Sequence, residues 1–210
     1  MSGAKGGMTL DLAEPGETVK IGSDKFIVMS KASTSVKLLR AILVGSTTAL
    51  AAASTDCNYN GSLLDQFCTG TFKDTLPATV QSFLVPTSFT YTRVNAGTSS
   101  TVTITRDIRL PTYSELSSSA WLTALRTYHN APSETANYAR RTQNAGGTFS
   151  PYWIADGYPT GSGRWREVNN TGAFGYTGAP HTDSYGMRPL LNLNPNTPVT
   201  TDADGYVIGG

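Results

Sequence analysis

Short runs of alternating apolar and polar residues open the chain, and a period of two is typical of β-strands. Residues 18–21 alternate, the turn residues 22–24 follow, and the apolar run 25–29 comes next. After a polar loop, residues 36–44 form another largely apolar run. The pattern predicts a small meander of three strands with a hydrophobic inner face.

Two later segments begin with a capping-box pattern, in which a Ser or Thr is followed three residues later by an acidic residue. Ser62 with Asp65 predicts the start of one helix. Thr112 with Glu115 predicts a longer helix that we expect to end near Tyr128.

Three further segments complete the predicted elements. Residues 77–84 suit a short helix, because proline is favoured in a first helical turn. Residues 87–106 alternate Thr or Ser with apolar residues and predict a hairpin or a long loop. Residues 133–147 are polar, with one helical turn expected around Tyr138. The mixture predicts an α+β fold.

The most informative segment spans residues 151–194. It begins with the apolar triplet 152–154 and ends with the arginine-led apolar strand 187–193. The interval between them is rich in Gly, Ser, Thr, Asn, Asp and aromatic residues and has almost no aliphatic side chains. Such an interval cannot form a core, but its composition is typical of adaptable binding surfaces.

The length of the chain, 210 residues with 39% hydrophobic content, is enough for one core. We predict a flexible N-terminal arm or attachment segment over residues 1–14 and a single domain over 15–210. No internal repeat or low-complexity linker divides the chain.

The small number of charged residues limits the classes of partner that the sequence supports. Only 15% of the residues are charged and the net charge is +1, whereas nucleic-acid binders carry a basic patch or stripe. The N-terminus lacks the apolar region of a signal peptide. The weakly apolar run 38–53 is too short and too polar to span a bilayer. We therefore expect synthesis in the cytoplasm, no membrane insertion and no nucleic-acid partner.

The chain has two cysteines, Cys57 and Cys68, which could be bridged, although two half-buried free thiols are the favoured interpretation. The two histidines, His129 and His181, are distant in sequence from them and from each other. Because a zinc site needs four ligands at close spacings, we expect neither a metal nor a cofactor.

Four motifs follow one another in an order that resembles a family of bacterial and phage domains. They are Asn-Tyr-Asn-Gly-Ser-Leu-Leu at 58–64, Leu-Pro-Thr-Tyr-Ser-Glu at 110–115, Tyr-Trp-Ile-Ala-Asp at 152–156 and Gly-Met-Arg-Pro-Leu-Leu-Asn-Leu at 186–193. The third motif departs from the family, which often has Arg-Ser where this chain has Ala155-Asp156.

The resemblance implies a C-type-lectin-like fold, related to the sulfatase-modifying enzymes that generate formylglycine. Two helices would flank a twisted antiparallel sheet, with long C-terminal loops displayed on one side. Some members of this fold are the variable proteins of diversity-generating retroelements, whose C-terminal surfaces are rich in Asn, Tyr, Ser, Asp and Gly. The interval 156–185 has that composition, so the resemblance extends to a hypervariable binding surface.

Ten side chains of this interval are the candidate ligand-binding residues, because aromatic rings give contact area at low entropic cost and small polar residues adapt. They are Tyr158, Arg164, Trp165, Asn169, Asn170, Phe174, Tyr176, His181, Asp183 and Tyr185. The alternative for the aromatic residues is that they only pack irregular turns on the sheet. Trp153 is assigned to the core, and Arg188 to a structural role in holding carbonyl or carboxylate groups.

Enzyme chemistry has little support in the sequence. The sulfatase-modifying relatives need cysteines near the C-terminal site, and this chain has none after Cys68. Residues as close along the chain as His181, Asp183 and Ser184 seldom meet as a catalytic triad. The acidic residues at 202–204 suit a turn, since the other ligands of a calcium loop are missing.

The sequence therefore favours a non-enzymatic ligand-binding or display protein, expected in a phage virion as a receptor-binding, fibre or capsid-decoration component. Its partners would be a host-surface protein or glycan and other virion proteins, and homo-oligomers are compatible with this role. The alternative is a purely structural assembly or decoration protein whose loops pack against neighbouring subunits. The expected location of the protein is the virion, or otherwise the cytoplasm. An enzyme of an unrecognised kind ranks last.

Overall fold

The computed structural model describes residues 7–48, 56–160, 163–177 and 184–209. The helical segments are η1 (Leu10–Leu12), α1 (Leu63–Gln66), η2 (Phe67–Phe72), η3 (Lys73–Thr75), α2 (Ala78–Gln81), α3 (Tyr113–Ser117), α4 (Ser119–Tyr128) and α5 (Ala136–Arg140). Of these, η1 and η3 are 3₁₀-helices and η2 is a π-helix that continues α1. No helix within the described ranges is long and apolar enough to cross a membrane.

The strands form three sheets. A seven-stranded sheet has the order β14-β15-β1-β2-β3-β13-β8, a five-stranded sheet the order β11-β10-β9-β12-β4, and a three-stranded sheet the order β5-β6-β7. Their bounds are β1 (Thr18–Ile21), β2 (Asp24–Lys31), β3 (Val36–Arg40), β4 (Val44–Thr48), β5 (Asp56–Cys57), β6 (Thr87–Asn95), β7 (Thr98–Arg106), β8 (Ile108–Arg109), β9 (Tyr152–Gly157), β10 (Trp165–Val168), β11 (Phe174–Thr177), β12 (Ser184–Met187), β13 (Leu190–Leu193), β14 (Thr200–Asp202) and β15 (Gly205–Ile208). The fold is therefore α+β and rich in sheet.

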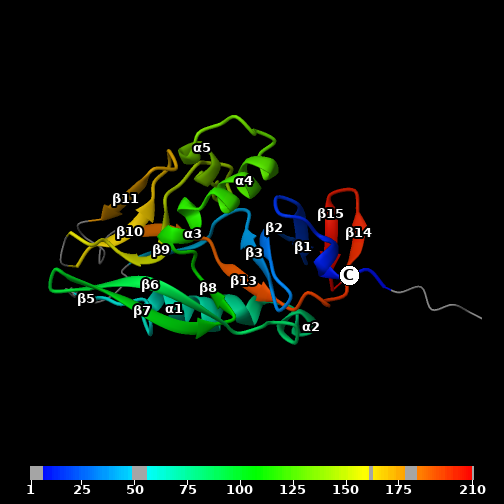
Figure 1. The fold of residues 1–210 in the computed structure, drawn as a ribbon, viewed down its shortest axis with the longest axis horizontal. Coiled ribbons are helices and arrows are strands. Elements are labelled where there is room, and N and C mark those ends of the chain that lie inside the picture. Colours follow the sequence, from blue (N-terminus) through cyan, green and yellow to red (C-terminus); the bar gives the residue numbers. More distant parts are fainter. Residues whose placement is uncertain (1–6, 49–55, 161–162, 178–183, 210) are drawn as a thin grey trace, which may run out of the picture.

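These elements form three layers. The β6–β7 hairpin and α1 lie on one side of the two larger sheets, and α3, α4 and α5 lie on the other (Figure 1). One hydrophobic core lies on the hairpin side and includes Leu64, Tyr91 and Trp153. A second core lies on the helix side and includes Leu125 and Ile154. The sheets separate the two cores.

Strand β9 shows the two-sided burial most clearly, since all six of its residues are buried. Side chains alternate across a strand, so Trp153 and Ala155 enter the hairpin-side core while Tyr152 and Ile154 enter the helix-side core. This confirms the prediction that Trp153 belongs to the core.

Several local predictions are confirmed. The Ser62 side chain accepts a hydrogen bond from the Asp65 amide, and Thr112 forms a complete capping box with Glu115. Residues 87–106 form the β6–β7 hairpin, whose turn residues Ala96 and Gly97 both have positive φ. Positive φ at both central residues matches the right-handed twist of the paired strands.

Two predicted elements are each divided in the structure. The predicted strand 36–44 is split into β3 and β4, which belong to different sheets. The predicted helix after Thr112 is interrupted at Ser118, which has extended backbone angles. The Ser118 hydroxyl donates to the Glu115 carbonyl and accepts from the Trp121 amide, so this serine ends α3 and caps α4.

The predicted arm 1–14 needs correction. Leu10 and Ala13 are fully buried, and the Leu10 amide donates to the Thr197 carbonyl at 2.9 Å. An isolated bridge pairs Thr9 with Pro198. Residues 9–13 are therefore part of the domain, because Leu10 and Ala13 pack in its core and the Leu10 and Asp11 amides donate to carbonyls of residues 197 and 195. Residues 1–6 lie outside the described ranges.

A buried ion pair joins the layers. The Arg109 guanidinium donates to both carboxylate oxygens of Glu115, at 2.8 and 2.6 Å, and Lys37 donates to the same carboxylate at 2.8 Å. Arg109 also lies over the Phe89 ring at 4.2 Å. One guanidinium therefore connects the hairpin, β8 and the start of α3.

The environment of the Glu115 carboxylate predicts that the protein loses stability in acid. Burial by itself would raise its pKa, but Arg109 and Lys37 outweigh burial and lower it to about 2. Because the pKa of Glu115 is lower in the folded than in the unfolded state, its ionised carboxylate stabilises the fold at any pH above the unfolded pKa near 4.5. This contribution is lost as the pH falls toward 2. We expect Glu115 to account for a loss of about 3 kcal/mol in the free energy of unfolding across that window.

Urea denaturation between pH 6 and pH 2 measures this loss. Glu115→Gln should be destabilised at pH 6, because it leaves Arg109 without its counter-ion, and should lose less stability than wild type on acidification. The exposed Glu134→Gln serves as the control and should follow wild type. Equal acid sensitivity of Glu115→Gln and wild type would contradict the assignment.

Candidate functional site

The candidate site lies on one face of the β9–β10–β11 sheet. In the register, Arg166 lies opposite Tyr176 and Val168 opposite Phe174. Directly opposite residues share a face, and so do residues two apart on one strand. The face toward α3 and α5 thus carries Arg166, Phe174 and Tyr176, with Tyr158 and Arg164 at the ends of β9 and β10.

Seven side chains on this face form a continuous stack, the arginine–aromatic ladder. Tyr113, the first residue of α3, and Arg140, the last of α5, complete it. Successive neighbours are Arg164 and Tyr176 at 4.6 Å, Tyr176 and Tyr158 at 4.2 Å, Tyr158 and Arg166 at 5.2 Å, Arg166 and Tyr113 at 4.1 Å, Tyr113 and Phe174 at 4.5 Å, and Phe174 and Arg140 at 4.2 Å, measured to ring centroids. Each ring therefore has two ladder neighbours.

The ladder is anchored at its Arg140 end. The Arg140 side chain donates to the Gly172 carbonyl at 2.9 Å and to the Asn137 side chain. Gly172 lies in the β10–β11 turn, which the Asn169 side chain closes by accepting from the Thr171 and Ala173 amides. The β10–β11 turn is thus attached directly to α5.

The ladder is anchored again at Tyr113. The Asp156 carboxylate accepts the Tyr113 amide at 2.6 Å and the Thr92 amide at 2.8 Å. Burial raises the pKa of Asp156, and these two hydrogen bonds oppose the shift. The positive charge of Arg166 opposes it as well. Asp156 therefore connects β9 to the hairpin and to the start of α3.

A cleft of about 160 Å³ adjoins the ladder at Tyr113. All of its lining residues except Asp156 carry a hydroxyl group; they are Thr90, Tyr91, Thr92, Thr101, Tyr113, Ser114 and Asp156. We call it the hydroxyl cleft. It lies between the β6–β7 hairpin and the start of α3, so a ligand in it would touch the ladder through Tyr113.

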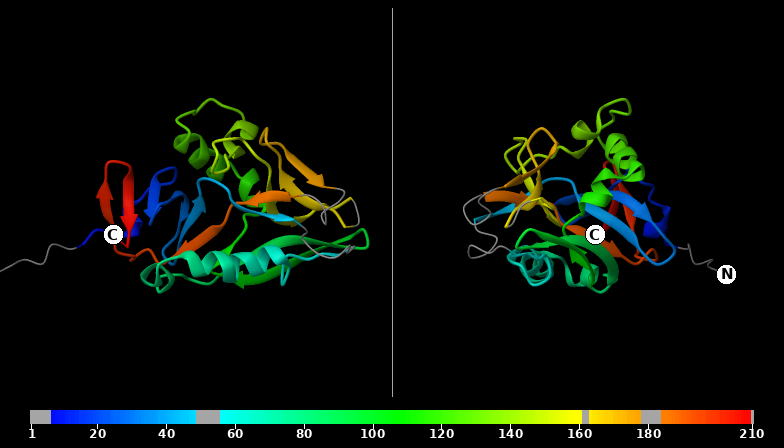
Figure 2. Two further views of the ribbon diagram at one scale, coloured as in Figure 1. Left: turned by 180° about the vertical axis from the view of Figure 1, so that it is seen from behind. Right: turned by 60° about the vertical axis from the view of Figure 1, so that its left-hand side comes forward.

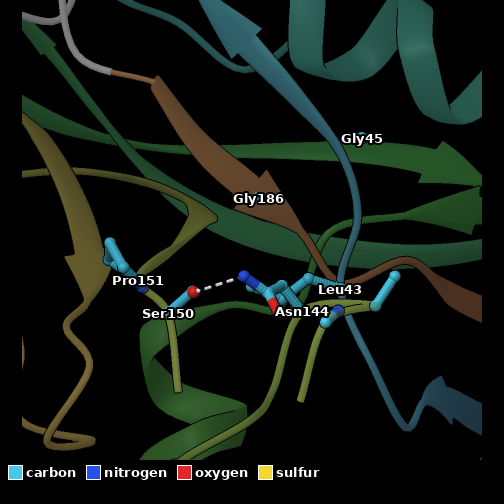
Figure 3. A pocket seen from close by; sticks show the side chains of 8 residues that line it. Leu43, Gly45, Asn144, Ser150, Pro151 and Gly186 are labelled. Carbon is cyan, nitrogen blue, oxygen red and sulfur yellow. Dashed lines mark hydrogen bonds between the residues drawn. The ribbon is translucent and has the colours of Figure 1, made fainter. Parts of the chain in front are cut away.

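A larger pocket of about 460 Å³ lies elsewhere, between Leu43, Gly186 and the loop 144–151 (Figure 3). None of its described lining residues has a charged side chain. The Asn144 side chain donates to the Ser150 hydroxyl at 3.1 Å and accepts from the Gly146 and Thr148 amides. Asn144 is thus engaged in shaping its own loop.

The structure separates the ten predicted binding residues. Tyr158, Arg164, Phe174 and Tyr176 come together in the ladder. Asn169 shapes the β10–β11 turn, and Asn170 is exposed beside it. His181 and Asp183 lie outside the described residues.

The remaining two predicted residues face the opposite side of the sheet. Trp165 is 3% exposed and belongs to the hairpin-side core, so the prediction that it lies on the binding surface is wrong. It lies opposite Gly157, and the alternation that exposes Arg164 and Arg166 buries it. Tyr185 is partly buried and stacks on Trp153 at 4.6 Å, also away from the ladder.

Sequence reasoning missed Tyr113, Arg140 and Arg166. For Arg166 a signal existed, since its spacing of two from Arg164 on a strand places both on one face. Tyr113 and Arg140 lie in helices distant in sequence, and nothing local connects them to the sheet. Arg188, in contrast, lies as predicted: it is fully buried and its Nε donates to the Arg40 carbonyl at 2.8 Å.

Other reactive groups are occupied or shielded. Cys57 and Cys68 are free and buried, as favoured from the sequence, and burial raises the pKa of each thiol to about 12. Both thiols are therefore protonated at neutral pH. Within the described part of the chain, no group of three or more His, Cys, Asp or Glu residues could hold a metal ion.

The acidic residues of the β14–β15 turn are also engaged. Asp202 and Asp204 pair with Lys20 at 2.8 and 2.6 Å. Asp202 lies opposite Gly205 across the hairpin, which confirms the predicted turn.

Comparison with protein families matches residues 33–195 to a family described as a domain of unknown function, DUF6273. The chain belongs to the DUF6273 family. No curated protein and no solved structure matches it. The DUF6273 segment contains the whole ladder and the hydroxyl cleft. It omits β1, β2, β14 and β15, which form one end of the seven-stranded sheet.

The Gly172 turn yields a prediction about how the ladder is held. Gly172 has φ +83°, and a Cβ there would lie 1.8 Å from the Asn137 carbonyl oxygen. Gly172→Ala should therefore force the β10–β11 turn away from α5 and lower the free energy of unfolding by about 3 kcal/mol or more.

Gly22→Ala is the matched control, since Gly22 has φ +60° and a Cβ there would meet no atom within 4 Å. It should lose only about 1–2 kcal/mol through backbone strain. Urea denaturation of both variants tests the difference. Equal losses would show that the contact of the turn with α5 does not stabilise the fold.

Proposed function

We propose that this DUF6273 chain is a non-enzymatic binding and display domain of a phage virion with a C-type-lectin-like arrangement. It would be a receptor-binding, fibre or capsid-decoration component. The arginine–aromatic ladder is its binding surface, and the partner is a molecule of the host-cell surface. The single observation that carries the proposal is the ladder itself.

The composition of the ladder supports recognition. Tyr and Arg are the residues that most often dominate binding energy at interfaces. Tyr113 and Tyr176 are 39% and 44% exposed, although large aromatic side chains bury most of their surface in cores. Stacking between rings and guanidinium groups fixes these side chains before a partner arrives, which reduces the entropic cost of binding.

The overall shape supports display. The β10–β11 hairpin lies at one end of the long axis, and the C-terminal hairpin β14–β15 lies at the other end (Figures 1 and 2). Segment η1, close to the N-terminus, lies at the β14–β15 end, since its residues bond to 195 and 197. Attachment through that end would direct the ladder outward.

The titratable groups near the ladder support binding over catalysis. Both oxygens of Asp156 accept backbone amides, and Arg140 donates to groups of the neighbouring turn and helix. These hydrogen bonds hold the surface in shape, which is the role expected of such groups at a binding surface. A C-type-lectin-like arrangement is consistent with helices on both sides of the sheets and a hairpin projecting at one end.

Cell binding tests the proposal. Fluorescently labelled protein is incubated with a panel of Gram-negative and Gram-positive bacteria, and bound label is measured by flow cytometry. We expect saturable binding to at least one strain. Arg164→Gln and Tyr176→Ala should each weaken it at least about tenfold, since loss of a central contact costs more than about 1.4 kcal/mol.

Arg126→Gln is the control, because Arg126 is a half-buried arginine outside the ladder that donates to the Glu134 carbonyl. It should bind like wild type. Thermal melting confirms that each variant is folded. Saturable binding that the ladder variants leave unchanged, or no binding to any strain, would overturn the proposal.

A further inference from the structure

The ladder leaves mainly polar groups available to a ligand. Each of its four rings already contacts two ladder neighbours, so the ring faces are largely occupied. A guanidinium that stacks on a ring uses its face, while its five N–H donors lie in its plane and point outward. The groups offered to a partner are therefore N–H edges and phenol hydroxyls.

Two of the three ladder arginines can offer part of this edge to a ligand; in the described part of the chain the Arg166 Nε is buried without a hydrogen-bond partner, which leaves its two terminal nitrogens. Arg164 and Arg166 are both partly exposed, and neither has an ion pair among the described residues. Arg140 is buried and bonded to Gly172 and Asn137. The nearby Asp156 accepts two backbone amides, and the charge of Arg166 opposes the burial-driven rise of its pKa without a direct ion pair between these two described side chains. In-plane guanidinium donors match the oxygens of a carboxylate, often in pairs.

The hydroxyl cleft adds a second requirement. It adjoins the ladder through Tyr113, whose ring lies 4.1 Å from the Arg166 guanidinium. Thr90 and Thr101 line it with exposed hydroxyl groups that can donate and accept hydrogen bonds, and Ser114 adds a third hydroxyl that also bonds to the Thr112 hydroxyl. A ligand that carries several hydroxyl groups next to an anionic group would satisfy both the cleft and the arginines.

We propose that the ladder and the hydroxyl cleft together bind an acidic saccharide. One carboxylate lies against the N–H edge of Arg166, beside the cleft that receives the sugar hydroxyl groups, and the carboxylate of a further acidic unit lies against Arg164, two rings farther along the ladder. This inference rests on the proposed function and names the ligand class of that surface. An acidic peptide would satisfy the arginines and leave the cleft hydroxyls unmatched. A nucleic acid requires a longer basic stripe than two arginines in a chain of net charge +1.

Calorimetric titration tests the ligand class directly. The probes are short oligosaccharides of galacturonate, hyaluronan and alginate, with methyl-esterified galacturonate as the uncharged match and hexaglutamate as the acidic peptide. At low salt we expect at least one acidic oligosaccharide to bind. If it is galacturonate, the ester should bind at least about tenfold more weakly; hyaluronan or alginate is compared with its own esterified form.

Substitutions locate the two halves of the site. Arg164→Gln and Arg166→Gln should each weaken saccharide binding about tenfold, whereas Arg126→Gln should not. Thr101→Val removes a cleft hydroxyl and should weaken binding several-fold. Thr103→Val is its control, because Thr103 is exposed on the same strand outside the cleft. Unchanged melting temperatures exclude misfolding as the cause of any loss.

The outcomes separate this inference from the proposed function. Equal binding of acid and ester, equal binding of hexaglutamate, or no binding of any acidic oligosaccharide overturns the acidic-saccharide inference. If cells are still bound through the ladder in that case, the binding function stands with a different ligand. If binding to cells is independent of the ladder, the proposed function itself fails.

Discussion

The buried pair of Arg109 and Glu115 is the interaction on which the rest of this structure depends. Arg109 is 1% exposed, so its charge requires a partner inside the protein. Glu115 supplies it and also completes the capping box of α3 through the Thr112 amide at 3.1 Å. The same carboxylate thereby neutralises the arginine and satisfies a free amide at the helix start.

The position of α3 follows from this pair and determines the candidate site. With its first turn held by Glu115, α3 places the Tyr113 amide on Asp156 of β9 and the Tyr113 ring between Arg166 and Phe174. A helix displaced by one turn would leave Asp156 buried with an unmatched oxygen and the ladder divided. The surface that we propose for binding is therefore connected to the core by two carboxylates, Glu115, which pairs with Arg109, and Asp156, which accepts the Tyr113 amide.

The ladder also changes which groups of this aromatic-rich surface can contact a ligand. A composition of Tyr, Trp, Arg and small polar residues suggests open rings that stack on a ligand. Here the rings stack on one another and on guanidinium groups, and Trp165 is in the core. We infer that the stack offers a partner mainly its N–H and hydroxyl groups. Recognition by such an edge depends on direction and charge more than on apolar area, which favours small anionic and hydroxylated groups.

Local hydrogen bonding explains which features the sequence determined by itself. The caps at Ser62 and Thr112, the β6–β7 hairpin and the β14–β15 turn each depend on groups within a few residues, and all were predictable. The apolar triplet at the start of β9 likewise identified Trp153 as core. The same reasoning failed where a distant partner decides the structure, as in the division of β3 from β4 and the docking of residues 9–13.

For the candidate site, the sequence determined the residue composition and the alternation of side chains along β10. Only the tertiary structure decided which face of that strand is buried and which is exposed. Period-two alternation places Arg164 and Arg166 on one side of β10 and Trp165 on the other. Which side meets solvent depends on what covers the sheet, and the hairpin covers the Trp165 side. Tyr113 and Arg140 join the ladder from helices on segments far from β10 in sequence. Such contacts between distant segments arise when layers pack, and no local pattern encodes them.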